Sequence, residues 1–193
     1  MGEAASRLLS PEEYLAWERT QPTRHELVHG AAVAMAGASL VHNKIVANVL
    51  RELSEALRAK PCDTLASDTR VRIPAGGHYR YPDASVACDP LEHEDDKLDT
   101  LLNPTILVEV LSDSTEAADR GEKFRDYRSI PSFREYLLVG QKEVLVEHYL
   151  RQENGLWTYR DAGPGERITL VSCGVELRVN ELYLKVFPLA SPG

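Results

Sequence analysis

Apolar residues recur at helical spacing in one long segment, residues 39–59. Positions three and four apart form one stripe, as on an amphipathic helix: Val41, Ile45, Val46, Val49, Leu53 and Leu57. A shorter helix is expected to begin at Ser10 and run to about Arg19, because Ser10-Pro11-Glu12-Glu13 is a capping box with proline at the first helical position. A third helix is expected over 116–128, after several residues able to cap it.

Strand-like patterns fill most of the remaining chain. Residues 25–35 alternate loosely around a turn at Gly30, and 64–73 and 79–87 are strand candidates joined by a Pro/Gly turn. A buried-looking strand covers 105–111, and a hairpin is expected from 134–139 and 143–150. Short strands around Trp157, Ile168 and Val175 and a helix near 180–184 complete the pattern. We therefore expect an α/β fold in which the long helix packs on one sheet.

The length of 193 residues, with 43% apolar and 27% charged residues, fits a single soluble domain spanning 1–193. No apolar run approaches the roughly 18 residues needed for a membrane span. The N-terminus lacks the basic and apolar regions of a secretory signal. Gly2 and Ser6 match the loose myristoylation pattern, but no polybasic segment follows. We expect a cytoplasmic protein that does not enter the membrane.

The three cysteines, Cys62, Cys88 and Cys173, are far apart in the sequence. An odd number without paired spacing argues against a disulfide framework and against a zinc knuckle, so buried thiols are expected.

The net charge of −8 counts against a nucleic-acid-binding protein, because affinity for phosphates comes from Lys and Arg. A nuclease can still be acidic overall if its groove is basic. Part of the negative charge is local, in a stretch expected to form a solvated loop: Asp89, Glu92, Glu94, Asp95, Asp96 and Asp99.

Two acidic residues stand inside apolar, strand-like runs. Asp83 follows Tyr81-Pro82, and Glu109 lies within the run 105–111. Burial of a carboxylate is costly unless it is compensated, and a divalent cation is the usual compensation. Two such carboxylates side by side would hold a hard metal such as Mg²⁺, the minimum equipment for metal-assisted phosphodiester cleavage.

Phosphodiester cleavage also benefits from a positive group near the attacking water. In the arrangement Pro-Asp followed by Glu-x-Lys, a lysine supplies it, but here the second motif reads Glu109-Val110-Leu111. The nearest substitute is Lys123 on the following helix, where it shares a face with Tyr127. Three purely structural roles stay open at this point. Lys123 can pair only with Asp119, Tyr127 can be core packing, and Glu26 can be a capping residue to Thr23.

The ordered set of these segments resembles the Uma-two family of restriction-endonuclease-like proteins, within the PD-(D/E)XK nuclease superfamily. The resemblance covers about residues 8–150. It runs through Ser10-Pro11-Glu12-Glu13-Tyr14, Glu26-Leu27-Val28-His29-Gly30, His42, Tyr81-Pro82-Asp83, Val108-Glu109-Val110-Leu111-Ser112, Asp119, Lys123, Tyr127 and Ile130-Pro131-Ser132-Phe133-Arg134-Glu135-Tyr136.

The resemblance implies a restriction-endonuclease-like mixed sheet flanked by helices, with additional antiparallel strands towards the C-terminus. It implies Asp83, Glu109 and the carbonyl of Val110 as ligands of Mg²⁺ or Mn²⁺, Glu26 as a further acidic residue at the edge of the site, and Lys123 as the relocated lysine. The implied activity is hydrolysis of DNA phosphodiester bonds. A homodimer is expected, because enzymes that cut both strands often pair two sites about a two-fold axis.

Two other functions are weighed against this one. His25-Glu26-Leu27-Val28-His29 matches H-E-x-x-H, which binds zinc in metalloproteases when it lies on a helix. A catalytically inactive binding module on a nuclease fold would also account for the displaced lysine and the negative charge. His42 is read as a polar helix residue rather than a ligand.

Overall fold

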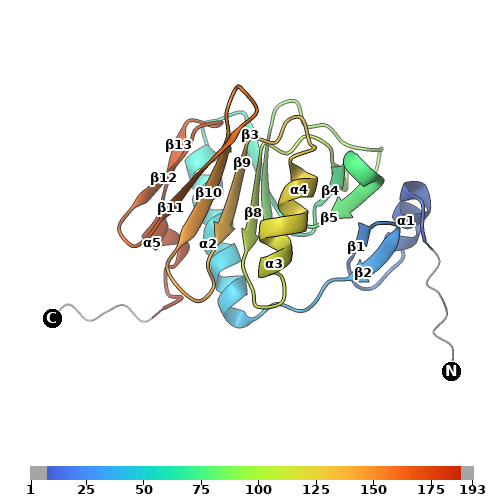
Figure 1. Ribbon diagram of the computed structural model, residues 1–193, viewed down its shortest axis with the longest axis horizontal. Helices are drawn as coiled ribbons and strands as arrows, with labels where there is room; N and C mark the ends of the chain where they lie inside the picture. Colours follow the sequence, from blue (N-terminus) through green and yellow to red (C-terminus); the bar gives the residue numbers. More distant parts are fainter. Residues whose placement is uncertain (1–7, 188–193) are drawn as a thin grey trace.

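A six-stranded mixed sheet forms the centre of the molecule in the computed structural model, which describes residues 8–187 (Figure 1). The strand order is β11-β10-β9-β8-β6-β3, with β8 and β9 parallel and the other neighbours antiparallel. The strands are β3 (Cys62–Ala66), β6 (Ala84–Cys88), β8 (Ile106–Val110), β9 (Glu135–Val139), β10 (Val146–Arg151) and β11 (Trp157–Ala162).

The long helix α2 (Leu40–Leu57) covers one face of this sheet. Its predicted stripe is confirmed: Ile45, Val49, Leu53 and Leu57 are buried, and Val41 and Val46 pack at the edge of the same core. Because side chains alternate along a strand, β8 serves two cores. Val108 packs with the α2 side chains, whereas Leu107 packs with Tyr127 on the opposite face.

The opposite face is covered by one continuous helical segment rather than a regular helix (Figure 1). It begins as α3 (Glu116–Ala118), continues as a π-helical turn η2 (Asp119–Lys123), and ends as α4 (Phe124–Tyr127). The predicted helix over 116–128 is confirmed in position. The π turn was not predicted, and both of its end residues, Asp119 and Lys123, are buried.

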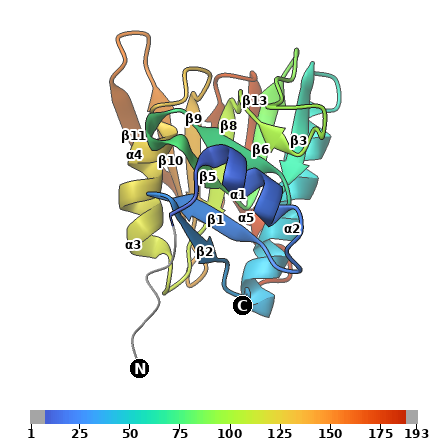
Figure 2. The ribbon, with the colours of Figure 1, turned by 90° about the vertical axis from the view of Figure 1, so that its right-hand side faces the viewer.

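A second sheet of order β2-β1-β5-β4-β7 lies beside the first, with α1 (Pro11–Glu18) packed against it (Figure 2). Its strands are β1 (His25–Val28), β2 (Ala31–Ala34), β4 (Arg70–Ile73), β5 (His78–Arg80) and β7 (Thr100–Leu101). Tyr14 of α1 is fully buried with Leu27 and Tyr79, and the capping box at Ser10 is present as predicted.

The expected strands 64–73 and 79–87 are each divided between the two sheets. A turn after Ala66 separates β3 from β4, and Tyr81-Pro82-Asp83 separates β5 from β6. Pro82 has no N–H group to donate to a sheet, so the chain leaves one sheet there and enters the other. The short 3₁₀ turn η1 (Ala75–Gly77) joins β4 to β5.

The C-terminal part adds a two-stranded sheet of β12 (Arg167–Leu170) and β13 (Val175–Arg178), followed by α5 (Val179–Leu182). These elements pack on α2 and extend its core. The mixed α/β class and the antiparallel C-terminal strands are confirmed. The expectation of one sheet is corrected to two main sheets and this small third one.

The expectation of three unpaired thiols is wrong, because Cys62 and Cys88 form a disulfide. Their sequence separation of 26 hides the fact that antiparallel β3 and β6 place these two residues directly opposite each other. Cys173 is free and buried.

The acidic stretch forms a loop, as expected, in which Glu94 and Asp99 are partly buried and the other acidic residues are exposed. Arg19 binds both Asp95 and Asp99, and Arg70 binds Asp99 at 2.7 Å. These ion pairs fix the segment between β6 and β8 on the second sheet.

None of the helices within residues 8–187 is long and apolar enough to span a bilayer. The N-terminal segment on which the expectations about a secretory signal and about Gly2 and Ser6 rest lies outside the described residues.

Truncation of the α2 stripe should weaken the main core. We expect Leu53→Ala to lower the free energy of unfolding by about 2–5 kcal/mol, because it leaves a cavity where a fully buried side chain stood. Leu40→Ala, on the same helix but 72% exposed, should change it by less than about 0.5 kcal/mol. Urea denaturation followed by circular dichroism would measure both, and equal losses would contradict the packing described.

The pairing of Asp99 should make stability depend on acid. Hydrogen bonds from Arg19, then from Arg70, hold the pKa of Asp99 well below its ordinary value despite partial burial. The stabilisation is therefore fully present above the unfolded pKa of 3.8 and is lost as pH falls towards the lower folded pKa.

Asp99→Asn should accordingly cost roughly 1 kcal/mol at pH 7, a value reduced by the partial exposure of the pair. The difference in the free energy of unfolding between Asp99→Asn and the wild type should become smaller below pH 3.8. Urea titrations at pH 7 and pH 3, with the exposed Asp96→Asn as control, would test this. A difference that stays constant down to pH 3 would contradict it.

Candidate functional site

Asp83 and Glu109 come together through the register of β6 and β8. Ala84 pairs with Val108 in this antiparallel pair, so one further step places Asp83 opposite Glu109. Ala84 and Val108 face α2, and the alternation of side chains directs Glu109 to the opposite face, under the α3–η2–α4 segment, where Tyr127 and Lys123 contact it. The Val110 N–H donates to Oδ2 of Asp83 at 2.7 Å, which fixes the aspartate against the end of β8.

The π turn places Lys123 against Glu109. Its Nζ atom lies 3.2 Å from Oε1 of Glu109 and 2.9 Å from Oδ1 of Asp119. Tyr127, expected to be core packing, is fully buried and also donates its hydroxyl to Oε1 of Glu109 at 2.7 Å. Glu109 is thus held by two side chains from one helical segment.

Burial dominates the electrostatics of the site. It raises the pKa of Glu109 to about 8, an effect that Lys123 opposes and that the charges of Asp119 and Asp83 reinforce. Burial acts to lower the pKa of Lys123, but Glu109, Glu26 and Asp119 hold it above its ordinary value. Glu109 and Asp119 therefore share the ammonium group of Lys123, and burial favours the uncharged form of Glu109 while no cation is bound.

His42 lies on a helix, as expected, and its ring also contacts this cluster. It lies in the first turn of α2, where its N–H donates to the capping hydroxyl of Ser39. Its Nε2 atom is 3.3 Å from Oδ2 of Asp83, and the pKa of His42 is raised mainly by its hydrogen bond to that carboxylate. The stripe of α2 predicted the helix but not which end of it would meet the aspartate.

Glu26 stands at the edge of the site but is engaged by other groups. It accepts hydrogen bonds from Arg80 at 2.9 Å and from the Tyr81 N–H at 3.2 Å. It lies on a strand, so the alternative that it caps a helix near Thr23 is wrong. Its charge reaches Lys123 without a direct ion pair between them.

Sequence reasoning missed the buried Arg80 altogether. Its guanidinium also binds Glu122 at 3.0 Å and Asp126 at 2.9 Å, so it joins β1 and β5 to the helical segment over the site. Glu122 and Asp126 are four residues apart on the helical segment, but no spacing in the sequence relates them to Arg80 or to Glu26.

The zinc-protease reading of His25 and His29 is wrong. His25 and Glu26 lie on the strand β1, and His29 is in the following turn with a positive φ of 49°. The His25 ring contacts Glu18 at 3.1 Å, whereas His29 lies 3.6 Å from Glu122. The two imidazoles therefore do not share the helical face that such a zinc site requires.

The donor set around Asp83 and Glu109 fits a hard cation. It offers carboxylate oxygens in a buried, negatively charged environment, and Mg²⁺ takes one or two carboxylates and keeps several waters. Within residues 8–187, the only group of three potential ligand atoms (from His, Cys, Asp or Glu) that lie within 4.8 Å of one another is formed by the three cysteines. The carboxylates of this site are not so closely grouped. The arrangement therefore suits an ion with few protein ligands rather than a closed protein cage.

The sequence is similar to a known family and to two known proteins. The model of the Uma2 family, described as "Putative restriction endonuclease", matches residues 11–180. Two proteins of Synechocystis sp. PCC 6803 are similar: the uncharacterized protein slr1290, 37% identical over 91% of this chain and 91% of its own length, and sll1609, 33% identical over 80% and 87%.

A solved structure shares the fold. The crystal structure of a putative nuclease belonging to DUF820 from Anabaena variabilis superposes with a TM-score of 0.72 at 16% identity, covering 93% of this chain and 99% of that one. Together with the match over residues 11–180, these similarities show that the chain belongs to the Uma2 family of restriction-endonuclease-like proteins.

Proposed function

We propose that this protein is a Mg²⁺-dependent endonuclease that hydrolyses DNA phosphodiester bonds. The observation that carries the proposal is the pairing of the buried Glu109 and Asp119 with the ammonium of Lys123, with Asp83 fixed beside Glu109 by the Val110 N–H. Asp83 and Glu109 offer the oxygen ligands that a hard cation takes, and the family and fold supply the nuclease context.

Asp83 and Glu109 would hold the ion, with the Val110 carbonyl as a further ligand and Glu26 acting at the edge or through water. A divalent ion bound there would lower the pKa of its water and polarise the scissile phosphate. The Val110 N–H and the Tyr127 hydroxyl orient the two carboxylates before an ion arrives, so less ordering is required on binding.

Lys123 would stabilise the negative charge that develops at phosphorus, or orient the attacking water. Its position between Glu109 and Asp119 keeps it protonated, which this role requires. His42 contacts the second proposed ligand, Asp83, and we propose that it positions the Asp83 carboxylate.

We further propose a cytoplasmic homodimer, since cutting both strands of a duplex requires two sites. Light scattering during size-exclusion chromatography would measure the mass directly.

Loss of the aspartate should abolish metal binding. We expect Asp83→Ala to weaken Mn²⁺ or Mg²⁺ binding by at least tenfold and to remove cleavage of duplex DNA. Loss of a residue that only supports a metal ligand typically lowers metal affinity about 10–100-fold, and loss of the ligand itself should lower it at least as much. Calorimetric titration and a gel-based cleavage assay would measure these changes. The matched control is Asp113→Ala, an exposed aspartate paired with Lys142 outside the cluster.

If Asp83→Ala retained the full metal affinity of the wild type, the metal-site assignment would be overturned. If the wild type bound metal but cut neither duplex, single-stranded nor branched DNA, the catalytically inactive binding module would replace the nuclease proposal.

Removal of the lysine should separate chemistry from binding. We expect Lys123→Ala to bind Mn²⁺ with little change and to reduce cleavage by about 10²–10³-fold, the loss typical for one group that stabilises transition-state charge. Lys142→Ala, an exposed lysine, is the control. Circular dichroism should first show that the variant is folded, because Lys123 also neutralises buried carboxylates. Unchanged cleavage would remove Lys123 from the mechanism.

A further inference from the structure

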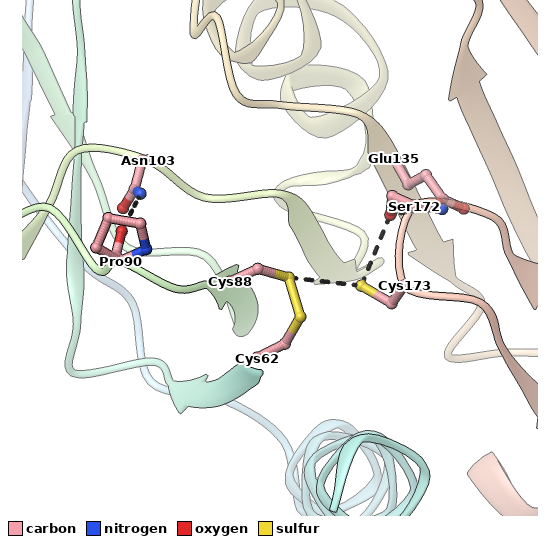
Figure 3. Close-up of a disulfide and its surroundings, with 7 residues drawn as sticks. All are labelled: Cys62, Cys88, Pro90, Asn103, Glu135, Ser172 and Cys173. Atoms are coloured by element: carbon pink, nitrogen blue, oxygen red, sulfur yellow. Dashed lines mark hydrogen bonds between the residues drawn. A yellow bond between two sulfur atoms is a disulfide. The ribbon is translucent and has the colours of Figure 1, made fainter. Parts of the chain in front are cut away.

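Three sulfur atoms converge from three distant segments on the side of the central sheet that faces β12 and β13 (Figure 3). Cys62 and Cys88 come from neighbouring strands β3 and β6, and Cys173 points towards them from the turn between β12 and β13. The three Sγ atoms all lie within 4.8 Å of one another, and those of Cys88 and Cys173 are 3.9 Å apart. This tricysteine cluster is not used by the proposed nuclease mechanism.

The spacing of the sulfurs suits tetrahedral coordination. With a Zn–S distance of about 2.3 Å, two thiolates on one zinc ion lie roughly 3.8 Å apart. The Cys88–Cys173 separation of 3.9 Å already matches this value. In the disulfide form Cys62 and Cys88 are bonded to each other, so only reduction frees all three as ligands.

The main chain around the cluster is fixed before any ion binds. Cys62 and Cys88 are opposite residues of one strand pair. The turn that carries Cys173 is held where the Ser172 N–H donates to Oε1 of the fully buried Glu135, at 2.6 Å (Figure 3). Preorganised ligands bind metal more tightly, because little chain ordering accompanies binding.

The burial and the nearby charges of the cluster also suit a zinc–thiolate group. Cys62 and Cys88 are half-buried and Cys173 is buried, so an ion can enter from the strand side and is then shielded. Burial raises the pKa of the Cys173 thiol and the Glu135 carboxylate adds to the rise, whereas the Ser172 hydrogen bond and the Lys60 ammonium act against it. Three thiolates with Zn²⁺ carry one net negative charge, and Lys60 is a positive group close enough to act on Cys173.

We propose that, once the Cys62–Cys88 bond is reduced, the three thiolates bind one Zn²⁺ ion with a water at the fourth position. Reduction takes two electrons and two protons from two equivalents of a small thiol, which become a disulfide. Zinc then displaces the thiol protons. Disulfide and metal therefore exclude each other, and sulfur ligands select zinc over the Mg²⁺ of the carboxylate site.

The experiment uses the full chain, reduced with a phosphine under anaerobic conditions and freed from excess reductant. Zn²⁺ is titrated in competition with a chromophoric chelator, and Co²⁺ serves as a spectroscopic probe of thiolate ligation. We expect one ion per chain and a sulfur-to-cobalt charge-transfer band, both lost in the oxidised protein.

Cys173→Ser and Cys62→Ser should each weaken binding by at least about tenfold, as expected for loss of a direct ligand. Two variants are used because either alone could disturb folding, and Cys62 is not fully buried. Asp83→Ala should bind zinc as the wild type does, which separates this site from the carboxylate site.

Three outcomes would overturn the proposal. They are absence of zinc binding by the reduced wild type, equal binding by the oxidised protein, and unchanged affinity in folded Cys173→Ser and Cys62→Ser variants.

Discussion

The burial of Glu109 in the middle of the central sheet is a cost that the surrounding structure has to offset. A carboxylate on a strand covered from both sides cannot remain charged without close partners. Lys123 and Tyr127 provide them, and both come from the helical segment that covers this face. The π turn matters here, because its two end residues, Asp119 and Lys123, are buried and paired with each other. The position of that segment is therefore tied to one acidic side chain.

Asp83, the other acidic residue of the site, lies where the chain passes from the second sheet to the central one. Asp83 ends the passage from β5 to β6 and is fixed by the N–H of the residue after Glu109. Three residues before it, Arg80 ends β5 and binds Glu26 of β1 and Asp126 of α4. Tyr81-Pro82-Asp83 thus lies between two ionic clusters, one for each sheet. The contacts of Arg80 on one side and of Asp83 on the other hold the chain where it changes sheet at Pro82.

The sequence predicted elements well where a single periodicity decided them, as in α2, the capping box of α1 and the strand around Glu109. The contact of Lys123 with Glu109 and the position of Asp83 beside the same strand agree with the expected site, because resemblance to a family carried spatial information that spacing alone lacks. The sequence could not divide 64–73 or 79–87 between sheets, since strand patterns do not reveal a partner. The Arg80 cluster and the Cys62–Cys88 pair escaped for the same reason: each depends on registers between segments far apart in the chain.

Strand β6 lies between the two proposed metal sites. Asp83 precedes its first residue and Cys88 is its last, so at about 3.3 Å per residue the two lie roughly 17 Å apart. That distance is too large for a shared ion but is spanned by one strand, which pairs with β3 along its whole length. The oxygen ligands at one end favour hard cations and the sulfur ligands at the other favour soft ones, so the two sites would not compete for the same metal. A change in pairing at Cys88 would nevertheless act on the strand that positions Asp83, which makes β6 the physical link through which the state of the sulfurs could reach the carboxylates.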